Sequence, residues 1–241
     1  MRVEPAAALA YVLPRIGARV VPFGARADLV FAWHTGTYLS PADAARLPTT
    51  AINRACVDIS KSTVDTAWAA ASSYSISVDP TSFEGQMVVK PEGNGVRGGH
   101  IVRGPIADRR AGFVYQMLVD CLIGDRIETT RPMVFGGRLL VVYHKRRAAQ
   151  DWFAGPEQVA VLAPADCYSS EEVGTLVRFC ALIGMDYGEL DVVRDSHSRL
   201  IYVVDANRTP IKPRGLAVAD EDAAFAPLAN ALRALLPVTA D

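Results

Sequence analysis

The chain has 241 residues, half of them hydrophobic, and its 25 Lys and Arg residues against 26 Asp and Glu give a formal net charge of −1. This composition can fill a hydrophobic core in one large domain or in two small lobes. The balanced charge argues against a general nucleic-acid or anionic-membrane surface, and no apolar run reaches the ~18 residues of a membrane span.

The first 75 residues have the pattern of a short α/β lobe. Residues 5–13 predict a helix, and residues 19–23 and 28–33 predict two strands separated by a glycine-containing turn. A second helix is expected over residues 61–71, with the hydroxyl of Ser60 as its N-cap. At about 70 residues, this lobe is too short for a full doubly wound sheet.

Residues 76–119 predict a small second lobe. Its expected elements are strands at residues 86–90, 100–103 and 113–119, a glycine-rich connection at residues 91–99, and a helix that begins at Ala107.

Residues 120–241 predict a larger third unit. Its expected elements are a hairpin of residues 131–135 and 138–143 that turns at Gly136 and Gly137, a helix over residues 170–183, a hairpin of residues 188–193 and 200–207, and a helix over residues 220–236. The helix over residues 170–183 has the clearest apolar spacing, with two glutamates in its first turn and Gly184 at its end.

The last of these hairpins carries candidate metal ligands. Asp205 and Asn207 are two residues apart, so on a strand they point to the same side, and the hairpin can bring Asp191 opposite them. Two carboxylates and an amide oxygen are hard ligands that suit Mg²⁺. The alternative is that the aspartates only end their strands.

The glycine-rich connection is a candidate phosphate site. Lys90 ends an apolar strand, and glycines follow it at positions 93, 95, 98 and 99. Such a loop lets backbone N–H groups close over phosphate oxygens, while the lysine neutralises their charge. No Gly-Lys-Ser/Thr follows, so the loop is not a P-loop. A simple turn is the alternative.

These parts occur in a set order, together with Lys61 at a helix start, the strand exit at residues 116–119 and Arg131 on a strand. This order resembles that of the ATP-grasp superfamily over about residues 51–210. The resemblance implies an α+β chain in which two α/β lobes clamp ATP, preceded here by a short truncated α/β N-terminal lobe. The corresponding boundaries are residues 1–75, 76–119 for the lid lobe, and 120–241 for the lobe with the metal site.

The resemblance also implies roles for individual residues. The implied ATP-binding residues are Lys61 and Lys90 on the phosphates, Gly95, Gly98 and Gly99 in the loop, and Gln116, Met117 and Val119 around the adenine. The implied magnesium ligands are Asp191, Asp205 and Asn207, and Arg131 is implied to stabilise the transferred γ-phosphoryl group. Gln116 stands where a glutamate is usual, and its amide oxygen can still accept from the adenine amino group.

Two departures bear on the substrate. Asp205 stands where many members have Glu, and Glu189 where many carry a substrate-binding arginine. The second departure changes which acid is bound or indicates a cationic substrate. Two further basic residues, Lys145 after a strand and Arg208 beside the predicted metal, are candidates for binding an anionic substrate.

The leading hypothesis is a ligase that uses ATP and Mg²⁺ to join a small-molecule carboxylate to an amine through an acyl-phosphate. The alternatives are a kinase that phosphorylates a small molecule and a non-catalytic nucleotide-binding partner subunit. Because the N-terminal lobe is short, a second copy in a homodimer or a partner subunit can complete the site. No nucleic-acid or membrane partner is expected.

The cysteines predict the compartment. Cys56, Cys121, Cys167 and Cys180 are scattered, with no Cys-x-x-Cys pair, so neither a zinc site nor a disulfide framework is expected. The first 13 residues contain no convincing secretory cleavage site, and a cytoplasmic location is expected.

Overall fold

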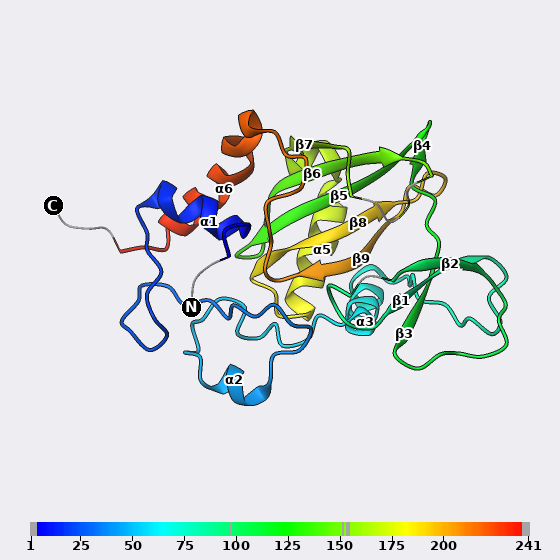
Figure 1. Cartoon of the computed structure of the whole chain (residues 1–241), viewed down its shortest axis with the longest axis horizontal. Helices are drawn as coiled ribbons and strands as arrows, with labels where there is room; N and C mark the ends of the chain where they lie inside the picture. Colours follow the sequence, from blue (N-terminus) through cyan, green and yellow to red (C-terminus); the bar gives the residue numbers. More distant parts are fainter. Residues whose placement is uncertain (1–3, 97, 151, 153–154, 238–241) are drawn as a thin grey trace.

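The computed structural model describes residues 4–96, 98–150, 152 and 155–237. Two antiparallel sheets form its framework (Figure 1). The smaller sheet has the order β2-β1-β3 and consists of β1 (Gln86–Pro91), β2 (His100–Arg103) and β3 (Phe113–Met117). The larger sheet has the order β7-β6-β5-β8-β9, with β4 paired to β5, and consists of β4 (Leu122–Ile123), β5 (Arg126–Phe135), β6 (Arg138–Ala148), β7 (Gln158–Leu162), β8 (Tyr187–Arg194) and β9 (Ile201–Asn207).

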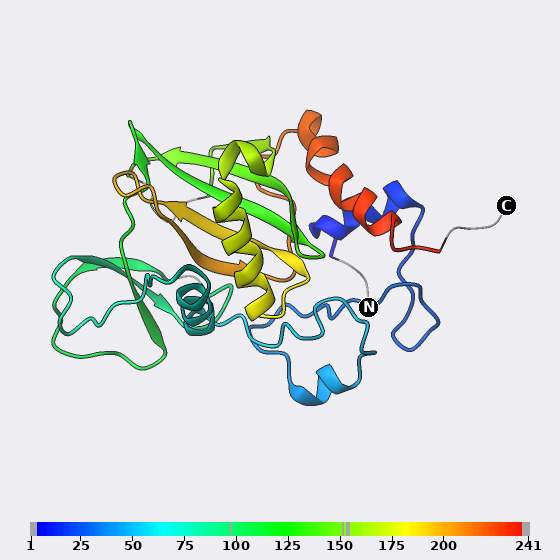
Figure 2. The same ribbon diagram turned by 180° about the vertical axis from the view of Figure 1, so that it is seen from behind.

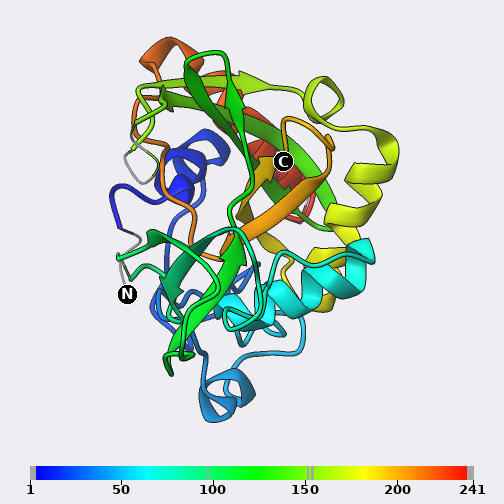
Figure 3. The same cartoon turned by 90° about the vertical axis from the view of Figure 1, so that its right-hand side faces the viewer.

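Helices cover the larger sheet and flank the smaller one. They are α1 (Ala8–Val12), η1 (Leu13–Ile16), α2 (Pro41–Ala45), α3 (Lys61–Ser72), α4 (Pro164–Cys167), α5 (Ser170–Leu182), η2 (Val218–Asp220) and α6 (Glu221–Arg233). Figure 2 shows α5 crossing one face of the larger sheet. Helix α3 packs against α5 and β9 and lies next to the smaller sheet (Figure 3).

The alternation of side chains along the strands produces two cores on opposite faces of the larger sheet. One face packs Val142, Leu190 and Val192 against Trp68 of α3 and Phe179 of α5. The other face packs its apolar residues against α1 and α6, where the rings of Tyr11 and Phe225 stack at 5.0 Å. The rest of this second face remains for polar side chains.

The predicted helices over residues 61–71 and 170–183 are confirmed, because their end signals are local. The Ser60 hydroxyl accepts the N–H of Thr63 at the start of α3. Ser169 and Glu172 form a reciprocal capping box at the start of α5. The predicted surface helix over residues 220–236 is also present, as α6.

The predicted α/β character of the N-terminal lobe is wrong. Residues 19–23 and 28–33 form no strand, and only isolated bridges, such as Phe31 with Ile52, occur in this part of the described chain. In residues 19–23, Val20 and Phe23 are 46% and 62% exposed, whereas Leu29, Phe31 and Trp33 pack against the core without forming a strand. The predicted first helix is shorter and continues as η1.

Side-chain bonds to distant backbone hold this N-terminal segment in place. The amide of Asn53 donates to the carbonyl of Tyr187 at 2.6 Å and accepts the N–H groups of Asp186 and Tyr187 at 2.8 Å. The segment is therefore tied to the start of β8 without a shared sheet.

Other differences concern strand lengths and loops. No helix forms after Ala107, where residues 104–112 run as a loop with exposed arginines. Strands β5 and β6 extend beyond the predicted hairpin, and α2, β4 and β7 were not predicted. Among the described residues, no helix combines the length and the apolar character needed to cross a membrane.

Candidate active site

The polar face of the larger sheet brings together residues of β8 and β9. Asp191 pairs with Asp205 and Glu189 with Asn207 in the antiparallel register. Residues directly opposite one another lie on the same face, as do residues two apart. A bulge follows Asp191, a common way to aim a side chain near a site. The predicted juxtaposition of Asp191, Asp205 and Asn207 on one face is thus confirmed by the register.

Asp191 is held by two cations from neighbouring strands. Arg131 of β5 donates to both carboxylate oxygens, from Nε at 2.9 Å and from Nη2 at 2.8 Å, and Lys145 of β6 donates from Nζ at 2.7 Å. Burial alone would raise the pKa of Asp191, but the charges of Arg131 and Lys145 hold this pKa well below its usual range. Asp191 is therefore ionised at neutral pH.

Glu189 lies behind this ion-pair cluster. Its side chain has no solvent exposure, and Nη1 of Arg131 lies 3.6 Å from its Oε2. Neither carboxylate oxygen has a hydrogen-bond partner among the described residues, and burial raises the pKa of Glu189 to about 7. A carboxylate this enclosed does not face an incoming cationic substrate; its cationic neighbour here is Arg131.

Two lysines from other elements, Lys61 of α3 and Lys90 of β1, lie near the same cluster. Lys61, at the start of α3, donates from Nζ to the carbonyl of Gly93 at 2.8 Å. Burial lowers the pKa of Lys90 on β1, while the nearby charges of Asp205, Asp65 and Asp191 oppose that effect and Lys61 adds to it. These electrostatic effects indicate that Lys61 and Lys90 lie near Asp191 and Asp205 on the polar face of the larger sheet.

The glycine loop contains two residues that need glycine. Gly95 and Gly98 have φ of 70° and 128°, which side chains disfavour. Gly99 has no such conformation, and His100 next to it is exposed with Nδ1 3.2 Å from the carbonyl of Gly98. The loop is attached to the N-terminal segment where the N–H of Asn94 donates to the Thr37 hydroxyl at 2.8 Å.

The predicted adenine-binding residues lie at the exit of β3. Gln116 is buried, and its Nε2 donates to Oδ1 of Asp65 on α3 at 2.6 Å. The N–H of Met117 already donates to the carbonyl of Ile76, and the Val119 side chain belongs to the core beside α3. Sequence reasoning missed Asp65, although it interrupts the apolar stripe of α3 that includes Val64 and Trp68.

Arg208, predicted to bind substrate, has a structural position instead. It is 1% exposed and donates to three backbone carbonyls of the N-terminal segment. The acceptors are His34 at 3.1 Å, Gly36 at 2.7 Å and Cys56. Three of its five N–H donors are thus paired with backbone and the side chain is enclosed, so the position of Arg208 is structural.

The donor set fits Mg²⁺. No cluster of three or more His, Cys, Asp and Glu side chains capable of holding a metal occurs in the described part of the chain. The predicted set instead combines two carboxylates with the Asn207 amide, all hard oxygen donors. Burial raises the pKa of Asp205, whose side chain accepts a hydrogen bond from the N–H of Ala206. Asn207 Oδ1 accepts the N–H of Thr209 at 3.0 Å.

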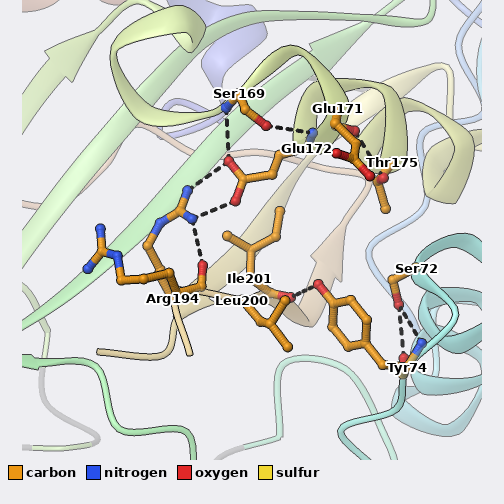
Figure 4. A pocket seen from close by; sticks show the side chains of 10 residues that line it. Ser72, Tyr74, Ser169, Glu171, Glu172, Thr175, Arg194, Leu200 and Ile201 are labelled. Carbon is orange, nitrogen blue, oxygen red and sulfur yellow. Dashed lines mark hydrogen bonds and ion pairs between the residues drawn. The ribbon is translucent and has the colours of Figure 1, made fainter. Parts of the chain in front are cut away.

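A cavity of about 430 Å³ lies elsewhere, between the end of α3, the start of α5 and the β8–β9 turn (Figure 4). In it, Arg194 donates to both carboxylate oxygens of Glu172 at 2.5 and 3.0 Å, and the Tyr74 hydroxyl donates to the carbonyl of Ile201. None of the predicted site residues lines this cavity, so it is separate from the charged face.

Solved structures with a similar fold include those of the ATP-grasp ligase PsnB. PsnB with a phosphomimetic variant of its minimal precursor, Mg and ADP matches with a TM-score of 0.56 at 19% identity, over 80% of this chain and 65% of that chain. PsnB with its minimal precursor, Mg and ADP gives 0.56 at 20% identity with the same coverage, and PsnB with the precursor peptide PsnA2 and AMPPNP gives 0.53 at 18% identity.

The chain thus has the ATP-grasp fold, as its resemblance in sequence implied, and it spans 65% of the length of PsnB. No protein-family profile and no curated protein sequence matches it.

Replacing Arg208 by Met should destabilise the protein by at least about 3 kcal/mol, because three buried carbonyls lose their donor. Denaturant unfolding measures this effect. The exposed Arg214→Met is the matched control and should change the free energy of unfolding by less than about 0.5 kcal/mol. Unchanged stability in the Arg208 variant would contradict the structural role.

Asp65→Asn should alter the pH dependence of stability. Burial raises the pKa of Asp65 to about 7, so its contribution is full below the ordinary carboxyl pKa and is lost as pH rises through about 7. The variant lacks this titration and should exceed the wild type in stability by roughly 3 kcal/mol above pH 7. Denaturant unfolding between about pH 5 and pH 8 tests this; parallel curves for the two proteins would refute it.

Proposed function

We propose that this chain is an ATP-dependent ligase that joins a carboxylate to an amine through an acyl-phosphate. The observation that carries the proposal is the position of Arg131 and Lys145, which pair with Asp191 on one face of the larger sheet. Lys61 and Lys90 lie close enough to this face for their charges to lower the pKa of Asp205. Cations from α3, β1, β5 and β6 thus lie around carboxylates suited to magnesium. This arrangement suits phosphoryl transfer, which depends mainly on positioning and neutralisation of charge.

Different residues of the chain bind different parts of the nucleotide in this proposal. Lys61 and Lys90 neutralise the α- and β-phosphates, and the N–H groups around Gly95 and Gly98 close over them. Gln116 meets the adenine edge. Asp191, Asp205 and Asn207 would hold Mg²⁺, which would supply neutralisation of phosphate charge.

Two chemical steps follow. An oxygen of the substrate carboxylate attacks the γ-phosphorus, the bond to ADP breaks, and the charge on the transferred group is neutralised by Arg131 and Lys145. The amine then attacks the acyl carbon, phosphate leaves with the carbon–oxygen bonding pair, and the amine loses a proton. No covalent protein nucleophile is required in either step.

Nucleotide binding would exchange the partners of the ion pairs around Asp191. Arg131 and Lys145 are both paired with Asp191, one of the proposed metal ligands. In the proposed site, phosphate oxygens would pair with these cations, and Asp191 would be free to hold the metal. One set of ion pairs replaces another, so the charges never stay buried without partners.

A substrate-panel assay tests the proposal. PsnB has been solved with precursor peptides, so the panel contains amino acids and also peptides with acidic side chains, each combined with amines. The expected result is ADP release that requires both substrates, with an amide product and free phosphate found by mass spectrometry. Phosphate retained on an acceptor would indicate a kinase, and ATP binding without turnover across the panel would indicate a non-catalytic partner subunit.

Lys90→Ala should weaken ATP binding by roughly 1.5–3 kcal/mol, the usual contribution of a hydrogen bond to a charged group. Calorimetry with a non-hydrolysable ATP analogue measures this effect. Arg103→Ala, at an exposed position of the neighbouring strand β2, is the control and should bind normally. Equal affinities for the two variants would remove Lys90 from the phosphate site.

Asp205→Ala and Asn207→Ala should each abolish turnover and leave the fold intact, because each removes a magnesium ligand from one face of β9. ADP release at saturating Mg²⁺, with circular dichroism to verify folding, measures the effect. Glu171→Ala, exposed on α5, is the control. Near-wild-type turnover in either β9 variant would show that the metal assignment is wrong.

A further inference from the structure

A buried hydrogen bond between Asp65 and Gln116 joins α3 to the smaller sheet. Gln116 is 1% exposed and Asp65 is 5% exposed, and Nε2 of the amide lies 2.6 Å from Oδ1 of the carboxylate. The amide oxygen of Gln116 has no hydrogen-bond partner among the described residues. One end of this amide is therefore occupied and the other is available.

The charge of Asp65 determines which end of the Gln116 amide points toward it. A side-chain amide has a donor end and an acceptor end of nearly the same shape, so its orientation follows from its partners. An ionised carboxylate only accepts hydrogen bonds. When it is ionised, above about pH 7, Asp65 therefore fixes the NH₂ group of Gln116 toward α3 and leaves the carbonyl oxygen as the available group.

The strand register places this oxygen beside the phosphate-binding lysines. Gln116 pairs with Val88, and Lys90 pairs with Val114, in the ladder of β1 and β3. Residues two apart lie on the same side, so the side chains of Gln116 and Lys90 leave the same face. The charge of Lys90 also lowers the pKa of Asp65, as a nearby cation does.

A purine base bound next to phosphates on these lysines meets the Gln116 amide with its edge. Adenine presents an amino group, a donor, where guanine presents a carbonyl oxygen, an acceptor. A fixed acceptor on the protein therefore matches adenine and opposes guanine. With a free amide, the same site would satisfy either base by rotation of the side chain.

We propose that Asp65 is a positioning residue that selects adenine over guanine nucleotides by fixing the orientation of the Gln116 amide. This inference rests on the proposed nucleotide site and adds to it the origin of base specificity. A buried hydrogen-bonding group that meets the wrong partner is a strong source of discrimination.

The test changes which member of the Asp65–Gln116 pair donates the hydrogen bond and which accepts it. In Asp65→Asn, the new amide both donates and accepts, so Gln116 is free to adopt either orientation. In the double variant Asp65→Asn with Gln116→Glu, the asparagine donates to a glutamate that can only accept, and an acceptor again faces the base. The affinities for non-hydrolysable ATP and GTP analogues are measured by calorimetry with Mg²⁺ at about pH 8, where Asp65 is ionised.

The wild type should prefer the ATP analogue by at least about 100-fold. Asp65→Asn should lower this preference at least about tenfold, chiefly through tighter GTP binding, and the double variant should restore it. Asp58→Asn is the matched control: Asp58 accepts from Thr63 Oγ1 at 2.7 Å near the start of the same helix, and its variant should keep the wild-type preference.

Three outcomes would overturn the inference, and they are distinguishable. If Asp65→Asn weakens both nucleotides equally, or changes neither, Asp65 is only a structural link and the nucleotide site stands. If selectivity falls but the double variant does not recover it, polarity is not the cause. If the wild type binds neither analogue, the proposed function fails and the role of Asp65 fails with it.

Discussion

The charged face of the larger sheet depends on the half-buried Asp191 and its two cations. A carboxylate removed from water in this way is costly unless it is paired and hydrogen-bonded. Arg131 from β5 and Lys145 from β6 supply both forms of stabilisation, so three strands must be in register for Asp191 to be tolerated. In the proposed function, the same pairing keeps two phosphate-binding cations in place before ATP arrives.

This cluster makes the two faces of the larger sheet differ in polarity. The face under α3 and α5 is apolar and holds one of the two cores that pack against this sheet. The other face is apolar only where α1 and α6 cover it, and the remainder carries Arg131, Lys145, Glu189 and Asp191. A polar surface of this kind needs a charged ligand or water over it, which is consistent with a nucleotide between the two sheets.

Helix α3 connects these parts physically. Its first residue, Lys61, binds the glycine loop, its buried Asp65 binds Gln116, and its apolar stripe packs into the core beside α5. Met117 of β3 packs against that core as well, and the smaller sheet is otherwise tied to α3 by these polar contacts. Such contacts exchange partners more readily than packed apolar side chains do, so movement of the smaller sheet over a bound nucleotide is physically reasonable.

The sequence by itself determined the elements whose signals are local. The cap at Ser60, the apolar period of α5, and the hairpin that carries Asp191 and Asp205 depend on neighbouring residues, and the structure confirms them. The order of lysines, glycines and acidic residues also indicated the fold that the comparison with PsnB shows.

Only the tertiary structure decided the rest, because the partners are distant in sequence. The strands expected at residues 19–23 and 28–33 need a partner strand that the fold does not supply, and side-chain bonds from Asn53 hold the segment instead. Arg208 donates to carbonyls at least 152 residues away, which no local pattern reveals. The same holds for Asp65: its position within an apolar stripe signals a special role, but its contact with Gln116 exists only once α3 and β3 are brought together by folding.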